Sequence, residues 1–273
     1  MRKLFALILT VLMVLSVLTA CSEEEEKKKI TLENTVIYDK NDLKITVTDM
    51  RTTTMGVYFD VSVENHSEKS VLFTASHFVV NGITVKGQCY IEAKAGKDTE
   101  DTFYLYNSGL ESAQIDTVAT VRGVNSAISN MDTLETMDTF IFNLVTSAGE
   151  DYVQEISRKG DVLLDSSDLT VLAQPFDHPT YGGATRLLFF NDTGKSIIVE
   201  AKDIKVNDKQ VDGQLHEMIY MDSVCYSDLN LYSSSLSSSG ISSVSSISFS
   251  LYVYDALLGT LMMDPKPIVI SVG

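Results

Sequence analysis

The sequence contains no tryptophan and only three cysteines, four prolines and four histidines in 273 residues. A scaffold held together by disulfides would need more cysteines at closer spacing, so that class of protein is excluded. None of the histidines has another histidine or a cysteine at the spacing of a metal site; they are His66, His77, His178 and His216. We predict neither a metal site nor a cofactor.

The reactive motifs of common enzyme classes are also missing. Gly194-Lys195-Ser196 looks like the end of a phosphate-binding loop, but Phe189 stands where that loop needs its first glycine. No Gly-x-Ser-x-Gly elbow occurs, and no base with an orienting acid stands out for a nucleophile. We therefore interpret residues 194–196 as a β-turn and predict that the protein is not an enzyme.

Basic residues are few, with 21 lysines and arginines against 37 acidic residues. Residues 21–273 hold 19 basic and 37 acidic residues, a net charge of −18. The excess is spread along the chain, with −8 in residues 30–148 and −9 in residues 149–273. Such a surface repels nucleic acid and anionic lipid and leaves neutral or cationic partners possible, but we interpret it first as a solvated surface that keeps an exported protein soluble.

The N-terminus has the three parts of a secretory signal. Met1-Arg2-Lys3 is basic, residues 4–18 are apolar apart from Thr10 and Ser16, and small residues precede Cys21. Leu18-Thr19-Ala20-Cys21 resembles the lipobox of bacterial lipoproteins. The resemblance implies cleavage before Cys21 and diacylglycerol on its sulfur, which meets the two-chain requirement for a stable anchor. It also places the mature chain on the extracytoplasmic face of the cell membrane.

An uncleaved transmembrane helix is the alternative interpretation of this segment. Residues 4–20 number 17, at the lower end of what a helix needs to cross a bilayer. A plain helical anchor does not require a small residue and a cysteine at its end, so the lipobox is favoured. Residues 22–29 are all polar or charged and are interpreted as a solvated spacer. We thus expect a signal peptide over 1–20 and a lipidated cysteine with a charged linker over 21–29.

Two interpretations of the remaining cysteines stay open. Cys89 and Cys225 could form one bridge in an oxidising exterior, but that bridge would have to join two separate domains. Unpaired cysteines commonly pack as small buried hydrophobic residues, and this interpretation is favoured.

From Ile30 onward, short runs alternate between apolar and polar residues, which is typical of β-strands with one buried face. Turn-forming residues separate the runs, and Asn81-Gly82 is the strongest hairpin signal. The tripeptides 65–67 and 191–193 fit the glycosylation pattern, but we interpret them as tight turns in which Asn65 and Asn191 bond the local backbone. A short helix is expected over residues 128–137. The alternating runs are 43–47, 57–63, 103–106, 140–144 and 247–253.

The chain contains an internal repeat with a constant shift of 126 residues and no gaps. Identical residues recur at this shift in turns and strands alike, for example Asn65 and Asn191, Gly87 and Gly213, and Leu105 and Leu231. A period this long is a whole domain and not a solenoid unit. The repeat also identifies the serine-rich residues 233–246 as a turn leading into a serine-faced strand pair, not as a linker.

Each copy is predicted to hold about seven or eight strands in roughly 110 residues, which is typical of a two-sheet sandwich. The Asp42-Leu43 strand entry, the Asn-x-Ser/Thr turns and the Asn81-Gly82 hairpin resemble features of the immunoglobulin-like domains of Gram-positive surface lipoproteins. The expected fold is all-β, with tandem immunoglobulin-like sandwiches over 30–148 and 149–273, linked near residues 148–160. Membership at this level implies no activity.

One loop stands out as a candidate binding segment. Residues 175–183 join two expected strands and differ wholly from residues 49–57 at the equivalent place in the first copy. Loops at one end of a sandwich are common partner sites, and this one carries Phe176, Asp177, His178 and Tyr181. An ordinary long hairpin connection is the alternative.

Together these features predict a non-enzymatic, membrane-anchored binding or scaffolding module of the cell envelope. The expected partners are the membrane, through lipid on Cys21, and an envelope protein or glycan, with no nucleic acid. One alternative is an accessory or solute-binding subunit of a transport or sensor complex. Another is an enzyme with an unrecognised site, which would need a concave pocket and titratable groups with shifted pKa values.

Overall fold

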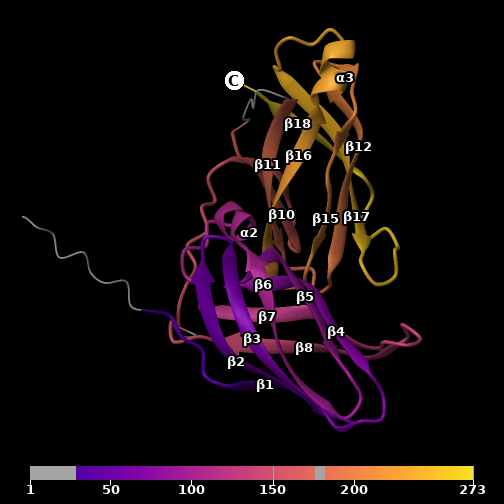
Figure 1. The fold of residues 1–273 in the computed structure, drawn as a ribbon. Coiled ribbons are helices and arrows are strands. Elements are labelled where there is room, and N and C mark those ends of the chain that lie inside the picture. The colour runs from indigo at the N-terminus through magenta and orange to yellow at the C-terminus, as the bar shows by residue number, and fades with distance from the viewer. Residues whose placement is uncertain (1–28, 150, 176–181, 273) are drawn as a thin grey trace, which may run out of the picture. The chain divides into compact units, whose positions relative to one another are not determined.

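The computed structural model describes residues 29–149, 151–175 and 182–272. Residues Thr31–Gly273 form one compact unit. The described chain is nearly all-β, as predicted, and is arranged as two β-sandwiches in tandem (Figure 1). Among the described helices, none is long and apolar enough to span a bilayer.

The first sandwich contains two antiparallel sheets. One sheet has the strand order β1-β2-β3-β6, and the other has the order β5-β4-β7-β8. The elements are β1 (Thr35–Lys40), β2 (Leu43–Thr53), β3 (Gly56–Asn65), β4 (Val71–Val80), β5 (Ile83–Ala93), β6 (Lys97–Tyr106), α2 (Asn107–Ser112), β7 (Thr120–Asn130) and β8 (Thr136–Val145).

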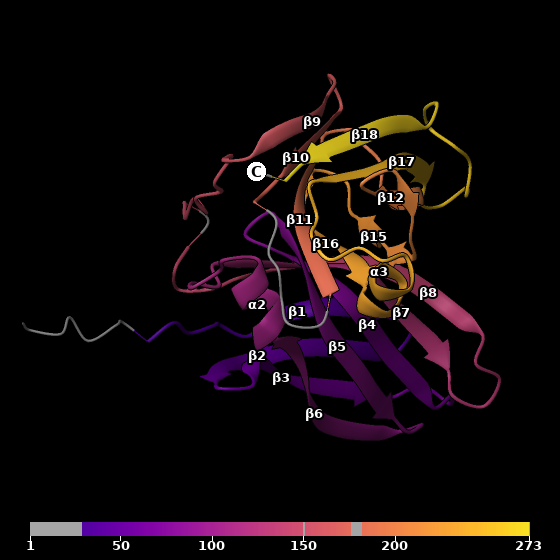
Figure 2. The same cartoon turned by 90° about the horizontal axis from the view of Figure 1, so that it is seen from above.

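The second sandwich repeats this plan. One sheet has the order β9-β10-β11-β16, and the other places β12 between β17 and the short strands β13 and β15, with β18 beyond β17 (Figure 2). The elements are β9 (Asp161–Asp165), β10 (Leu169–Ala173), β11 (Gly182–Asn191), β12 (Ile197–Val206), β13 (Lys209–Gln210), β14 (Gly213–Gln214), β15 (His216–Ile219), β16 (Ser223–Tyr232), α3 (Ser233–Ser238), β17 (Ser246–Asp255) and β18 (Lys266–Ser271).

The predicted repeat is visible in the element bounds. Adding 126 to the first and last residues of β3, β4, β6 and α2 gives those of β11, β12, β16 and α3. Asn81 and Gly82 form the predicted β4–β5 hairpin turn and have positive φ angles of 49° and 83°. The domain limits at residues 148 and 149 stay a prediction, since β8 ends at Val145 and β9 begins at Asp161.

A glycine at the same position of each copy lets a strand that follows the second hairpin pair with the opposite sheet. This strand is β5 in the first copy and β14 in the second. Gly87 lets β5 pair briefly with β6, because a Cβ there would lie 2.6 Å from the Tyr104 carbonyl oxygen. Gly213 does the same in β14, where a Cβ would lie 2.6 Å from the Asn230 carbonyl oxygen. The crossing therefore requires glycine in both copies.

Two sequence-based expectations about helices were wrong. Residues 128–137 contain the end of β7, a turn and the start of β8, and not a helix. The serine-rich segment begins with the helix α3 instead of a turn, although it then leads into the strand β17 as predicted, and α2 occupies the matching place in the first copy. Neither short helix has a side-chain cap at its N-terminus, so the usual sequence signal is missing.

Candidate functional site

The predicted site residues lie outside the part of the chain that the structure describes. This applies to Cys21 and to the four loop residues Phe176, Asp177, His178 and Tyr181. Their roles stay predictions.

The two described cysteines, Cys89 and Cys225, are unpaired and buried, which confirms the favoured interpretation. Burial raises the pKa of both thiols well above the ordinary value, and for Cys225 the neighbouring carboxylate of Glu217 adds to the effect. Because the thiolate is the reactive form, these sulfurs are poor nucleophiles and poor metal ligands.

The residues that look like a phosphate-binding loop form a turn, as predicted. Residues 192–196 connect β11 to β12, with Gly194 at a φ of 68°. The Asn191 side chain donates to the carbonyl oxygen of Lys195 at 2.8 Å and accepts the backbone N–H of Thr193 at 3.2 Å. Asn65 makes the same two bonds to Lys69 and Ser67 at 2.9 and 3.1 Å. Within the described ranges, no group of three or more His, Cys, Asp or Glu residues is placed to hold a metal ion.

The best-formed candidate site is a cleft of about 460 Å³ between the two copies. The copies meet where β16 pairs with β5, with Val224 opposite Ile83 and the Val224 N–H donating to the Gly82 carbonyl at 2.9 Å. The walls come from β5, the β6–α2 junction, β14, β15 and β16. They comprise Thr84, Val85, Lys86, Tyr106, Ser108, Gly109, Ser112, Ala113, Gln214, His216, Glu217, Cys225, Tyr226, Ser227, Asp228 and Asn230.

An ion pair joins the two sides of this cleft. Lys86 Nζ lies 3.5 Å from Glu217 Oε2, and the Ser227 hydroxyl donates to the same oxygen at 3.4 Å. The Glu217 side chain is only 12% exposed, whereas that of Lys86 is 64% exposed. The carboxylate is thus held in the wall, and the ammonium stays free to move toward a bound group.

Arg186 forms a second link across the junction. Its Nε lies 3.1 Å from Asp228 Oδ1, and its Nη1 donates to the Ser112 carbonyl oxygen at 3.5 Å. Thr84 Oγ1 and Ser223 Oγ are 3.1 Å apart in a third contact. These bonds fix the β16 wall against the end of α2, so the cleft is preformed.

The lining offers hydroxyl, amide and phenol groups together with two carboxylates, Glu217 and Asp228, and two basic side chains, Lys86 and His216. Such a surface can hydrogen-bond a polyhydroxylated or peptide-like molecule. Ser227 is paired with a carboxylate, and His216 Nδ1 lies 2.9 Å from Glu200 Oε1, so these two side chains do not form a serine–histidine pair. Hydrogen-bonding side chains therefore line the walls of the cleft.

Sequence reasoning missed this cleft. Its walls come from residues far apart in the chain, and the Thr84–Ser223 contact spans 139 positions. The repeat gives no hint of it, because β5 and β16 are not equivalent elements. A second cavity of about 640 Å³ lies at the end of the first sandwich, where Tyr38 and Lys40 both contact Asp138 at 3.1 Å. We favour the smaller cleft, since binding sites occur preferentially where domains meet.

Comparisons with known proteins give little guidance. No family model matches the sequence, and no curated protein is similar to it. A red sea bream transglutaminase structure is similar at 9% identity with a TM-score of 0.24, over 88% of this chain and 31% of the transglutaminase. This chain therefore spans about a third of that enzyme's length, and a likeness this weak bears on neither activity nor substrate.

Proposed function

We propose that this protein is a lipoprotein anchored through Cys21 on the extracytoplasmic face of the cell membrane, where it acts as a non-enzymatic binding or scaffolding module. The observation that carries the proposal is the ordered series of basic start, apolar run, small residues and cysteine in residues 1–21. The charged spacer over 22–29 supports it, because a folded domain needs clearance from the lipid surface.

The preformed cleft between the copies supports a binding role for the folded part. Hydrogen-bonding groups line it, and Lys86 and Glu217 balance each other's charge there. Neutral envelope glycans or protein segments suit such a lining better than polyanions.

The anchor is tested by fatty-acid labelling in cells. Cys21→Ala should abolish the label and leave uncut precursor or released protein. Cys89→Ala is the matched control, since its buried thiol is shielded from acylation and the label should persist. Unchanged labelling of Cys21→Ala would contradict the proposal.

The binding role is tested by photocrosslinking in intact cells. A photoreactive side chain at Ser112, in the cleft wall, should capture one discrete partner, whereas the same group at the adjacent exposed Glu111 should capture much less. Equal capture at both positions would contradict recognition in the cleft. A membrane transporter or sensor as the captured protein would favour an accessory-subunit role.

A further inference from the structure

The turn after β17 presents two leucines to solvent. Leu257 is 91% exposed and Leu258 is 65% exposed. The turn is the tip of a hairpin, because the Asp255 N–H donates to the Thr260 carbonyl at 2.9 Å and Leu261 pairs with Tyr254. Solvated leucines side by side at a hairpin tip are unfavourable unless something apolar covers them.

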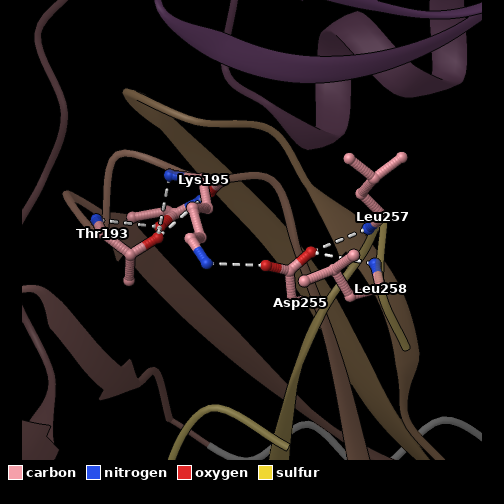
Figure 3. Close-up of polar contacts among 6 residues, drawn as sticks. Thr193, Lys195, Asp255, Leu257 and Leu258 are labelled. Atoms are coloured by element: carbon pink, nitrogen blue, oxygen red, sulfur yellow. Dashed lines mark hydrogen bonds and ion pairs between the residues drawn. The ribbon is translucent and has the colours of Figure 1, made fainter. Parts of the chain in front are cut away.

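A buried carboxylate holds this turn in one conformation. Asp255 Oδ1 accepts the backbone N–H groups of Leu257 and Leu258 at 3.0 and 3.1 Å, and Asp255 Oδ2 pairs with Lys195 Nζ at 2.8 Å (Figure 3). The lysine hydrogen bond lowers the pKa of this carboxyl group, so it stays ionised. The leucines therefore sit on a preorganised turn and need no ordering when they meet a surface.

The first sandwich builds the same turn with Asp132 and Thr133 at the two leucine positions, followed by Leu134, which is 73% exposed. Asn130 Oδ1 accepts the N–H groups of Asp132 and Thr133 at 2.7 and 3.2 Å. The closing bonds also match: the Leu134 N–H donates to Asn130 O at 2.8 Å, as the Gly259 N–H donates to Asp255 O at 2.8 Å. In the second copy the turn begins at Asp255, one residue before the position that the 126-residue shift gives for Asn130.

The two turns share the same backbone hydrogen bonds but differ in their side chains. Asp132 and Thr133 are exposed in the first copy, at the places taken by Leu257 and Leu258 in the second. Because the turn forms with either pair, its folding does not require the leucines.

We propose that Leu257 and Leu258 insert into the lipid bilayer and give the protein a second membrane contact beside its anchor. The proposal rests on the lipid anchor at Cys21. Residues 21–30 can span at most about 35 Å when fully extended, so an anchored domain stays near the lipid surface. The anchor thereby raises the effective concentration of the tip at the bilayer.

The chemistry of the tip favours lipid over a protein partner. Protein interface hot spots are rich in Trp, Tyr and Arg and poor in Leu, whereas leucine is typical of interfacial insertion to about 5–10 Å. The acidic chain, with 37 acidic and 21 basic residues, gains nothing from anionic headgroups. The contact is therefore hydrophobic and should not need anionic lipid.

The absence of tryptophan permits a direct test in the full acylated chain, reconstituted in phosphatidylcholine vesicles. Leu258→Trp introduces a single tryptophan, whose emission should shift to the blue and be quenched by brominated phosphatidylcholine. Thr133→Trp, in the matching turn, is the control and should stay unquenched. Unquenched emission from Leu258→Trp would overturn the proposal. A blue shift without quenching would also overturn it, because a protein surface would then cover the turn.

A second arm separates this proposal from the anchor. The intact mass of the same sample shows whether Cys21 is acylated. For an unacylated chain that begins at residue 21 and carries Cys21→Ser, and so lacks the apolar residues 4–20, replacing both leucines by serine should lower the vesicle-bound fraction by about tenfold or more. Acylation without quenching would support the lipid anchor and contradict insertion of the turn. Quenching without acylation would support insertion and contradict the anchor. A bound fraction that the serine variant leaves unchanged would contradict insertion.

Discussion

A stack of aromatic rings in the core of the first sandwich is replaced by smaller, non-aromatic side chains at the matching positions of the second. Phe103 stacks on Phe59 and Phe78 with ring centroids 4.7 and 5.5 Å apart. The equivalent positions in the second sandwich hold Leu229, Thr185 and Ile204, all of them buried. The same backbone plan thus tolerates two different fillings, in keeping with the general tolerance of cores to repacking at similar volume.

One pair of facing strands shows how the volume is redistributed. Gly123 lies opposite Phe142 on β7 and β8, and Phe249 lies opposite Ile268 at the equivalent positions on β17 and β18. The large ring sits on the last strand in the first copy and on the preceding strand in the second.

The asparagines that hold turns together are identical in the two copies. Asn81 Oδ1 accepts the backbone N–H groups of Ala119 and Thr120, and Asn207 Oδ1 accepts those of Ser245 and Ser246, all at 2.9 to 3.1 Å. A side chain that satisfies several backbone groups in a fixed geometry has no substitute of similar shape, whereas a core position has several.

The largest effect is expected at the buried turn asparagines. Asn65 donates to the carbonyl oxygens of Ala93 and Lys94 at 3.0 and 3.2 Å, besides its turn bonds. Asn65→Ala should lower the free energy of unfolding by about 2–4 kcal/mol, because buried backbone groups lose their partners. Urea denaturation measures the loss.

Asn191→Ala supplies the same test in the second copy, where the amide donates to the carbonyl oxygens of Ile219 and Tyr220 at 3.2 and 2.9 Å. A similar loss is expected there. Asn230→Ala is the control, since that amide makes one exposed bond to the Asp228 carbonyl. If either turn variant lost less than about 1 kcal/mol of unfolding free energy, the asparagine bonds shared by the two copies would not be a main source of the stability of each sandwich.

The next largest effect on stability is expected at Gly123, which lies opposite the ring of Phe142. In Gly123→Ala the added Cβ would lie 2.1 Å from a ring carbon of Phe142, so the unfolding free energy should fall by about 1–3 kcal/mol. Adding Phe142→Leu should restore part of the loss, because the smaller side chain makes room. A double variant less stable than both single variants would refute the volume exchange.

A smaller change in stability, of opposite sign, is expected at Thr185. This residue occupies in the second copy the position that Phe59 occupies in the first. Thr185 is fully buried, and its hydroxyl has no hydrogen-bond partner among the residues that the structure describes. Thr185→Val should raise the unfolding free energy by about 1 kcal/mol, since it removes an unsatisfied polar group at nearly constant volume. Thermal unfolding that shows no gain would mean that the hydroxyl is satisfied in solution.

The smallest effect is a pH dependence of stability that arises from His77 on β4 of the first copy. Burial lowers the pKa of His77 below its ordinary 6.5, with Glu217 opposing and Lys86 adding to the shift. The unfolded state therefore binds the proton more readily, so this stabilisation is complete above about pH 6.5 and is lost as the pH falls through the folded-state pKa. His77→Gln should flatten the stability profile below pH 6.5, and an unchanged profile would exclude the histidine as its cause.

The fold could be predicted from sequence because its signals are local and occur twice. Alternation marked the strands, and the matching positions of Asn65 and Asn191 aligned the copies. The expected helix at 128–137 failed because apolar residues three apart coincide there with a β7 irregularity and the Asn130 turn. The helices α2 and α3 were not predicted, because they consist largely of glycine and serine, which have low helix propensity.

The candidate site was harder to foresee than the fold. The cleft depends on β5 meeting β16, a contact that strand periodicity and repeat alignment do not encode. The exposure of Leu257 and Leu258 was equally hidden, since apolar residues near a strand end are expected to be buried.

The most direct test of the account is the mass of the N-terminal peptide of the protein isolated from cell membranes. We predict a peptide that begins at Cys21 and carries the mass of a diacylglyceryl group on that residue. A peptide that begins at Met1, or an unmodified Cys21 in membrane-bound protein, would contradict the account.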